Sequence, residues 1–300
     1  MNSLKKEVKI FCEKSKLKGN GHYVRSQRLN SFLKVNKYKS TVYCNKTANQ
    51  INKIIDDSKN PFYLILDFKN YEKIEIKKTK KILKTLVFEN IDKIKFFNNT
   101  NIFPLDIQFA KNSGAEFYQF PKDFYSKKNS HKFKKFKKEC IKILIIQGGT
   151  DANNNLNKIV KILKKDNLNF NYELIVKTNN IKSINKNIYN SKKVRIIGRV
   201  KNMSKIYDKI DIAVSSCGGL AFELGFMGIP TIHLTSERRE IIRAKLLEKK
   251  GLGIFCLPRN IKKLIYEINK IYIDEVYRKR LISKRLLFFR KKNKILKLLK

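Results

Sequence analysis

His22 has the position and the chemistry of a general base. It follows the turn Gly19-Asn20-Gly21 and precedes residues 23–35, whose apolar side chains recur at helical spacing. The positive end of a helix dipole disfavours a charged imidazole, so a neutral ring here can take a proton from water. The alternative is a polar residue that caps the helix on a surface loop, and the position alone leaves both open.

Asp67 is placed to share a crevice with His22. The apolar run Val8–Cys12 predicts a buried strand before His22, and Phe62–Phe68 predicts another that carries Asp67 near its carboxyl end. In open α/β sheets the ligand crevice lies outside the carboxyl ends of the parallel strands. Both side chains are therefore expected to face it.

A glycine pair, Gly218-Gly219, separates a strand from a helix in the second half of the chain. The run Ile210–Ser215 predicts a buried parallel strand, and residues 220–227 predict the helix. The bare turn leaves room for a ligand, and the helix start offers N–H groups and a positive dipole end that suit a phosphate. Glu223, one turn into the helix, can accept hydrogen bonds from a ribose diol. The alternative is a tight turn in which Glu223 caps or pairs locally.

The elements that must hold these residues alternate between strand and helix in both halves. Residues 141–146, IKILII, predict a strand that runs into a second glycine turn containing Gly148, Gly149 and Thr150. Alternating strands and helices predict an α/β fold with two doubly wound, Rossmann-like parallel sheets that face each other across a cleft.

The boundary between the two halves is a lysine-rich stretch after Pro121 without sustained periodicity, which predicts a linker. In the first half we expect a lysine-rich helix over residues 73–84. The predicted parts are an N-terminal domain at 1–125, a basic linker at 126–139, a C-terminal domain at 140–272 and a closing helix at 273–300.

Composition excludes several classes of protein. A hydrophobic content of 42% and a charged content of 31% indicate a globular chain. The net charge of +43 raises nucleic-acid binding as an alternative, but the lysines are spread along the whole chain, whereas a nucleic-acid footprint is clustered. We expect no nucleic-acid partner. With no run near the roughly 20 apolar residues of a membrane span and no signal-peptide core, we expect a cytoplasmic protein.

The cysteines and histidines do not predict a metal site. None of the five cysteines forms a CxxC pair, and the chain has three histidines. Free cysteines beside apolar strands behave as small buried hydrophobic residues. We expect no metal and no cofactor.

The C-terminal stretch RLISKRLLFFRKKNKILKLLK interleaves apolar and basic residues. It can form a basic amphipathic helix on anionic lipid, which would give peripheral membrane contact. The alternative, which we favour, is a closing helix that packs back across the N-terminal domain with solvated lysines.

Four segments together resemble a known family. In chain order they are KIFCEKSKLKGNGHYVRSQRL, FYLILDFKNY, ILIIQGGTDANN and VSSCGGLAFELGFMGIPTI. The pattern is similar to that of the UDP-sugar hydrolases of the pseudaminic-acid pathway, whose relatives include the sporulation polysaccharide proteins and, more distantly, the glycosyltransferases that make peptidoglycan lipid II. The likeness runs from about residue 7 to 257, and its most specific parts are GxGHxxR and GGxxxxEL followed by GIP.

The resemblance implies a GT-B fold with a UDP-sugar in the cleft and hydrolysis without a metal. His22 would position the water that attacks the anomeric carbon of the sugar. The implied substrate-binding residues on the sugar side are Gly21, Arg25, Asp67 and Glu237. The implied nucleotide-binding residues are Gly148, Gly149, Thr150, Gly218, Gly219 and Glu223.

The sequence departs from the family's pattern on the sugar side, at Phe11-Cys12-Glu13, Glu89-Asn90 and Glu237-Arg238-Arg239. The identity of the sugar therefore stays open. So does the reaction, because hydrolysis needs only a water beside His22, whereas a glycosyltransferase needs an acceptor. We expect a monomer.

Overall fold

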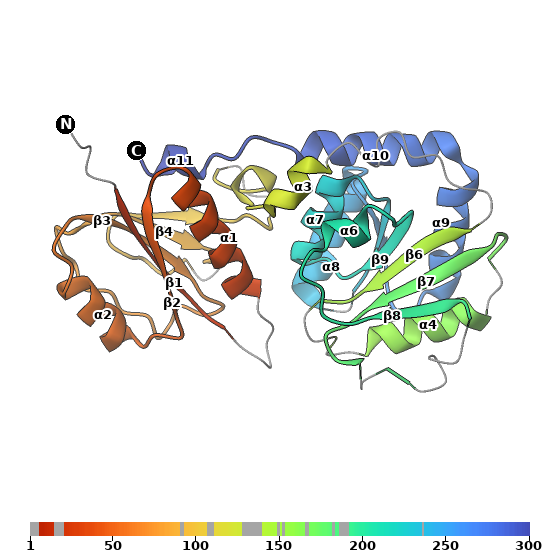
Figure 1. Ribbon diagram of the computed structural model, residues 1–300, viewed down its shortest axis with the longest axis horizontal. Helices are drawn as coiled ribbons and strands as arrows, with labels where there is room; N and C mark the ends of the chain where they lie inside the picture. The colour runs from red at the N-terminus through yellow and green to blue at the C-terminus, as the bar shows by residue number, and fades with distance from the viewer. Residues whose placement is uncertain are drawn as a thin grey trace. The chain divides into compact units, whose positions relative to one another are not determined.

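The fold is described from a computed structural model, and contacts divide the chain into two units. The first unit comprises Met1–Phe120 and Lys292–Lys300, and the second comprises Pro121–Lys291 (Figure 1). The structure describes residues 6–14, 21–90, 93–106, 111–127, 140–148, 151, 154–165, 168–181, 184–185, 192–235 and 237–300.

The first unit contains a five-stranded, fully parallel sheet in the order β2-β1-β3-β4-β5. Its strands are β1 (Glu7–Cys12), β2 (Lys39–Cys44), β3 (Phe62–Asp67), β4 (Ile82–Phe88) and β5 (Asn99–Ile102). Its helices are α1 (Gly21–Val35), α2 (Ala48–Asp56), the 3-10 turn η1 (Ala115–Phe117) and α11 (Ile295–Leu298).

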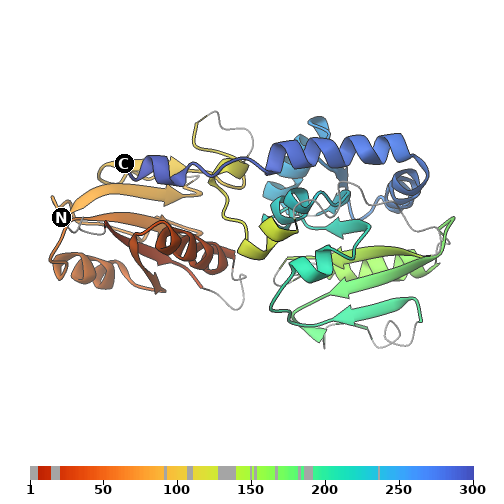
Figure 2. The same ribbon diagram turned by 45° about the horizontal axis from the view of Figure 1, so that its top comes forward.

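Alternate residues of β1 feed two hydrophobic clusters on opposite faces of this sheet. Ile10 packs in the cluster that contains Leu29 of α1 and Ile295 of α11. Phe11 packs in the cluster that contains Ile51 of α2. Figure 2 shows α11, the last helix of the chain, lying beside the strands of the first unit.

The second unit contains a six-stranded parallel sheet in the order β11-β10-β9-β6-β7-β8. Its strands are β6 (Ile141–Ile146), β7 (Tyr172–Lys177), β8 (Val194–Ile197), β9 (Ile212–Ser215), β10 (Thr231–Leu234) and β11 (Ile254–Cys256). Its helices are α3 (Lys122–Ser126), α4 (Asn155–Lys165), α6 (Ser204–Tyr207), α7 (Gly219–Met227), α8 (Arg238–Lys249), α9 (Ile261–Ile273) and α10 (Glu275–Phe289). This is the strand order of the dinucleotide-binding fold, so the prediction of two parallel, Rossmann-like α/β domains is confirmed.

The predicted helix over residues 73–84 is wrong. Residues 72–81 are irregular, and β4 begins at Ile82. The backbone here is held by Asn52 of α2, which donates to the carbonyl of Glu75 at 3.0 Å and accepts from the N–H of Lys77 at 3.0 Å. The side chain of Asn52 therefore takes hydrogen bonds of the backbone that would lie within the chain segment itself if residues 73–84 formed a helix.

The predicted closing helix over residues 273–300 is not continuous. α9 ends at Ile273, α10 ends at Phe289, and the chain then runs to the short α11. Arg290 Nε donates to the carbonyl of Phe226 at 2.9 Å at the break, and Ile295 of α11 is buried in the first unit.

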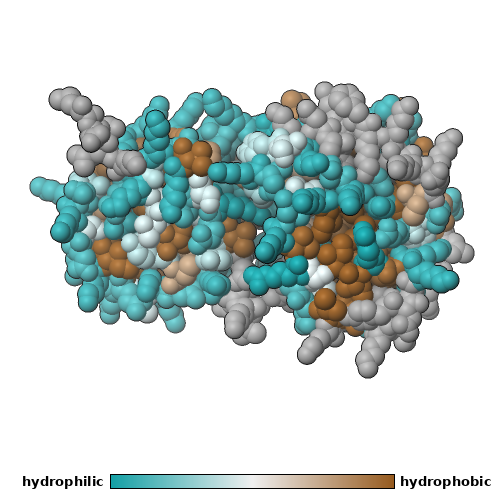
Figure 3. All heavy atoms as spheres, in the orientation of Figure 1, coloured by the Kyte–Doolittle hydropathy of each residue, from teal (hydrophilic) through white to brown (hydrophobic). Residues whose placement is uncertain are grey.

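Several apolar side chains of this segment pack within the protein, whereas Leu287 is 82% exposed. Ile282 and Leu286 of α10 are buried in the second unit, and α10 packs on α7 through Phe289, whose ring lies 5.2 Å from that of Phe222. Membrane contact through this segment stays a prediction. Within the described part of the chain, every helix is too short or too polar to cross a bilayer. Figure 3 shows hydrophilic residues spread over both units on the visible face, with a larger hydrophobic area on the second.

Candidate active site

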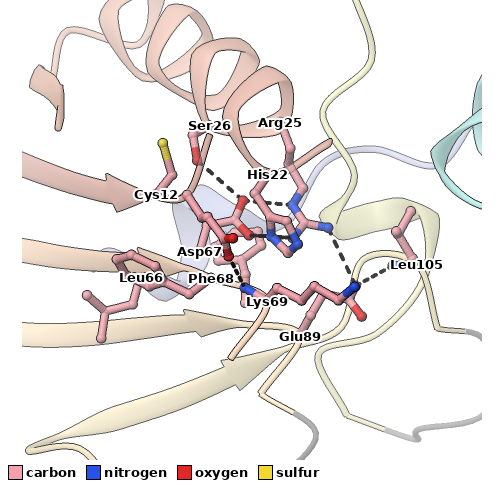
Figure 4. Close-up of polar contacts among 12 residues, drawn as sticks. Cys12, His22, Arg25, Ser26, Leu66, Asp67, Phe68, Lys69, Glu89 and Leu105 are labelled. Carbon is pink, nitrogen blue, oxygen red and sulfur yellow. Dashed lines mark hydrogen bonds and ion pairs between the residues drawn. The ribbon is translucent and has the colours of Figure 1, made fainter. Parts of the chain in front are cut away.

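The candidate catalytic residues meet between β1 and β3, where the strand order of the first unit reverses. His22 lies in the first turn of α1, after the loop that leaves β1, and Asp67 is the last residue of β3. Arg25 follows His22 by three residues and therefore lies on the same side of α1. Figure 4 shows these side chains converging on the Asp67 carboxylate.

Asp67 holds both of the other side chains through its carboxylate. Its Oδ1 lies 2.7 Å from His22 Nδ1 and 2.5 Å from Arg25 Nη2, and its Oδ2 accepts from Arg25 Nε at 2.9 Å. The side chains of Asp67 and Arg25 are 2% and 8% exposed, whereas that of His22 is 25% exposed. Among the three, His22 therefore offers the most surface to a small molecule.

Asp67 is ionised although it is buried. Burial raises the pKa of this carboxyl group, but the charge and hydrogen bonds of Arg25, followed by those of His22, outweigh burial and lower the pKa to about 2. Burial lowers the pKa of Arg25, but the charge and hydrogen bonds of Asp67, together with the charge of Glu89, outweigh burial and raise the pKa above its usual value.

The ionisation of Asp67 sets the tautomer of His22. A carboxylate can only accept a hydrogen bond, so we assign the proton of the 2.7 Å contact to His22 Nδ1. The neutral ring then carries its lone pair on Nε2. This arrangement suits an imidazole that accepts a proton from a substrate or water.

Ser26 and Glu89 also belong to the cluster. The sequence analysis did not single out Ser26, and it placed Glu89 on the sugar side without a partner or a role. Ser26 Oγ donates to Asp67 Oδ2 at 3.3 Å, and Arg25 Nη1 lies 3.7 Å from Glu89 Oε1. Ser26 follows His22 by four residues, so helical spacing was a usable signal for it. Glu89 follows β4, and only the pairing of β4 with β3 brings it to Arg25.

The residues expected to touch the sugar divide into two groups. Asp67 and Arg25 are buried and engaged with each other, so we interpret them as residues that orient His22. Gly21 is exposed, and a Cβ built on it would meet nothing within 4 Å, so there is open space beside His22. Glu237 is exposed at the N-cap of α8 in the second unit.

The reversal of strand order in the second unit lies between β6 and β9, and two glycine turns meet there. Gly148 follows β6, and its N–H donates to Ser216 Oγ after β9 at 3.3 Å. Gly218 is the N-cap of α7, so the positive end of this helix begins at the turn. Gly149 and Thr150, and residues 128–139 of the predicted linker, lie outside the described residues.

Glu223 is 7% exposed, one turn into α7. The hydroxyl of Tyr207 donates to its Oε2 at 3.3 Å. Tyr207 is itself buried, and its ring packs edge-on against Phe124 at 5.7 Å. The contact of Glu223 with a ribose stays a prediction.

The turn at Cys217-Gly218 is held by side chains that the sequence analysis did not single out. Glu240 Oε2 accepts the N–H of Cys217 at 3.0 Å and the hydroxyl of Thr235 at 2.7 Å, and Arg243 donates to the carbonyl of Cys217 at 2.7 Å. A Cβ on Gly218 would lie 3.0 Å from Glu240 Oε1, so the glycine also makes room for this carboxylate. Nothing in the sequence tied α8 to this turn.

A metal site would need a cluster of ligating side chains among the residues that the structure describes. Among those residues, no group of three or more histidine, cysteine, aspartate or glutamate side chains is arranged as a metal site.

Known sequences do not assign this chain to a family. No protein-family model matches the chain. The uncharacterised protein MJ1062 of Methanocaldococcus jannaschii is 27% identical over 124 residues, which are 40% of this chain. The match spans 24% of the length of that protein.

Solved structures resemble the chain over nearly its whole length. The spinosyn rhamnosyltransferase SpnG, complexed with thymidine diphosphate, has a TM-score of 0.64 at 9% identity and covers 97% of this chain and 100% of its own. MurG of Acinetobacter baumannii has a TM-score of 0.59 at 13% identity, over 98% of both chains. The chain has the GT-B fold.

A putative UDP-N-acetylglucosamine 2-epimerase of Listeria monocytogenes is also similar, with a TM-score of 0.56 at 11% identity over 94% of this chain and 91% of its own. Identities this low establish the fold alone, and one fold hosts several chemistries. The activity must therefore be argued from the residues of the site.

Proposed function

We propose that this protein hydrolyses a UDP-activated amino or deoxy sugar at its anomeric carbon and releases UDP, as in the synthesis of pseudaminic-acid-type surface glycans. The observation that carries the proposal is the 2.7 Å contact between His22 Nδ1 and the buried carboxylate of Asp67. The resemblance of the sequence to UDP-sugar hydrolases supports it. So does the GT-B fold, which the chain shares with a glycosyltransferase complexed with thymidine diphosphate.

In the proposed reaction His22 Nε2 takes a proton from water. The water oxygen forms a bond to the anomeric carbon while the bond from that carbon to the diphosphate oxygen breaks, and UDP leaves with the electron pair. The imidazolium formed on His22 is stabilised by Asp67, which stays ionised because its pKa is held at about 2. A positioned general base of this kind contributes about 10²–10⁴-fold to a rate.

In the same proposal the second unit binds the nucleotide. Backbone N–H groups at the start of α7 hold the diphosphate, because a helix N-terminus is suited to phosphate, and the glycine turn after β6 leaves room for the phosphates. Glu223 binds the ribose. Glu237 binds the sugar.

Glycosyl transfer is the second candidate, and the similarity to SpnG and MurG favours it. His22 would then take the proton from a hydroxyl of an acceptor. The geometry around His22 serves both reactions equally, because water and an alcohol present the same O–H group to Nε2.

The test is UDP release from a panel of UDP-amino-sugars by the wild-type protein and by His22→Ala. We expect UDP release without any acceptor, and a loss of about 10²-fold or more in His22→Ala. Val24→Ala is a matched control, because Val24 lies on the same turn of α1 but is 40% exposed. It should keep the wild-type rate.

Two outcomes would contradict the proposal. Equal rates for His22→Ala and the wild-type protein would remove His22 from the chemistry. UDP release that begins only when an acceptor is added would favour transfer. Calorimetric titration with UDP should give similar affinities for all three proteins, since the nucleotide-binding residues belong to the second unit.

A further inference from the structure

Two cysteines lie side by side at the carboxyl edge of the first sheet. Cys12 is the last residue of β1, Cys44 is the last residue of β2, and the two are register partners in this parallel pair. Their Sγ atoms are 3.7 Å apart. Neighbouring strands are about 4.8 Å apart, which lies within the range of Cα separations of about 4.4–6.8 Å found in disulfides.

We propose that Cys12 and Cys44 are an oxidation site that closes to a reversible disulfide. The two sulfur atoms must approach by roughly 1.7 Å to reach the usual S–S bond length. Rotation of the two side chains at the strand ends brings them together. This site lies outside the residues to which the proposed hydrolysis assigns a role.

Exposure decides which thiol reacts first. Cys44 is partly exposed, whereas Cys12 is buried. Burial, followed by the neighbouring Cys44, raises the pKa of Cys12 to about 12, so Cys12 is held as a thiol. The oxidant therefore reaches Cys44 first, and Cys12 acts as the resolving thiol.

Hydrogen peroxide can convert the two thiols to a disulfide in two steps. The thiol of Cys44 reacts with hydrogen peroxide to give a sulfenic acid and one water. The sulfur of Cys12 then attacks the sulfenic sulfur, the S–O bond breaks, and a second water leaves with the proton of Cys12. The two thiols lose two electrons in total, and the peroxide is reduced to two waters.

The thiol pair is connected to the His22 cluster. Cys12 pairs with Asp67 in the register of β1 and β3, and it contacts Ser26, which donates to Asp67 Oδ2 at 3.3 Å. Figure 4 shows Cys12 beside Ser26 at the edge of the cluster. Drawing the sulfur of Cys12 toward β2 removes its contact with Ser26 and disturbs the carboxylate that orients His22. This coupling rests on the proposed function, whereas the disulfide itself does not.

The disulfide is tested on the full-length protein with hydrogen peroxide, followed by alkylation, trypsin and mass spectrometry. Cleavage after lysine yields Ile10–Lys14 and Ser40–Lys46, one cysteine each. We expect these two peptides to be joined after oxidation and separated again by a thiol reductant. Cys44→Ser should abolish the joined species. Cys140→Ser, which removes another partly exposed cysteine, should leave it unchanged.

Two outcomes overturn the proposal. One is oxidation in which Cys12 and Cys44 remain unlinked, with Cys44 alone carried to sulfinic acid. The other is linkage of either cysteine mainly to Cys140, Cys217 or Cys256, which would indicate disulfides formed in unfolded chains.

The coupling is tested separately, so that its failure can be told from failure of the proposed function. We expect UDP release to fall about tenfold or more on oxidation and to recover on reduction, since a displacement of ~1 Å in a reacting group costs up to about 100-fold. Cys44→Ser should be insensitive to peroxide. If no UDP-sugar is turned over, the ring signals of His22 in NMR spectra still report the coupling, because they shift between reduced and oxidised protein. Unchanged signals would refute it.

Discussion

The two units place different chemical groups at the point where the strand order of their sheet reverses. In the first unit the reversal of strand order is occupied by polar side chains, with the ionised Asp67 between His22 and Arg25. In the second unit it is lined by the turns at Gly148 and Gly218, where the Gly148 N–H donates to Ser216 Oγ and the positive end of α7 begins. Side-chain charges can move a proton, whereas backbone dipoles bind an anion without taking part in proton transfer.

The carboxylates of Asp67 in the first unit and Glu240 in the second also have different partners. Asp67 is paired with a buried cation and orients a titratable ring. Glu240 accepts hydrogen bonds from the backbone and from Thr235, and so fixes the shape of a turn. Removing Asp67 should therefore affect chemistry, and removing Glu240 should affect binding. Three predictions test how the two units differ, two in chemistry and binding and one in acid stability.

The largest effect is expected for Asp67→Asn. The amide cannot hold the proton on His22 Nδ1 as a carboxylate does, and it leaves Arg25 without its closest counter-charge. We expect UDP release to fall by about 10²–10⁴-fold and the free energy of unfolding to fall by about 3–5 kcal/mol, the cost of breaking a buried ion pair. Steady-state kinetics and urea unfolding measure the two effects.

Glu13→Gln is the matched control for Asp67→Asn. Glu13 is a second carboxylate at the same edge of the sheet, but it is partly exposed, and its side chain accepts the N–H of Lys69 at 3.3 Å. The Glu13→Gln variant should release UDP at a rate close to the wild-type rate and have a similar free energy of unfolding. If Asp67→Asn retained UDP affinity and also full turnover, the assignment of proton chemistry to the first unit would be lost.

The second prediction compares the acid stability of the two units. His233 of β10 is fully buried, and burial, followed by the charge of Arg285, lowers its pKa to about 3. The unfolded chain binds a proton at this position below its ordinary pKa of 6.5, whereas the folded chain does not. Stability is therefore complete above pH 6.5 and is lost as the pH falls, by about 2 kcal/mol at pH 5.

In the first unit the corresponding loss starts at lower pH. Asp67 has a lowered pKa, so its contribution is complete above its ordinary value of 3.8 and is lost as the pH falls toward 2. Hydrogen exchange at pH 5 should therefore show earlier opening in the second unit. His233→Gln should flatten the pH dependence of the second unit between pH 6.5 and 4. Equal opening of both units at pH 5 would contradict this comparison.

Much of this arrangement was predictable from local patterns. Continuous apolar strands and helical periodicity indicated two parallel sheets, and residues after a first strand and at the end of a third were expected at one edge. His22 and Asp67 meet there because β1 and β3 are neighbours. Periodicity fails where side chains replace backbone partners, as at Asn52, whose hydrogen bonds hold residues 72–81 out of a helix.

The supporting residues were not predictable for a related reason. Glu240 and Arg243 reach the turn at Cys217 only because β10 lies beside β9, and strand order is not encoded in the local pattern. Arg25 was assigned to the substrate from the family resemblance alone, and Asp67 also from its place near the carboxyl end of a strand. Their burial and the contacts of Asp67 with Arg25 and His22 indicate that they orient His22.

The smallest effect is expected for Glu240→Ala. This variant should distinguish substrate binding by the second unit from the chemical step at the first. The substitution removes the acceptor for the N–H of Cys217 in the turn before α7 and for the hydroxyl of Thr235 after β10, so α8 no longer holds the turn through this side chain. We expect KM for the UDP-sugar to rise by about tenfold, which corresponds to the roughly 1–2 kcal/mol of such contacts, while kcat changes little.

Glu240→Gln separates shape from charge, because its amide oxygen can still accept from the N–H of Cys217. It should restore most of the affinity that Glu240→Ala loses, since the turn needs an acceptor there more than a negative charge near a bound diphosphate. A fall in kcat with KM unchanged would mean that Glu240 acts on the chemical step. The division between a unit that moves protons and a unit that binds anions would then fail at the residue that best defines the second.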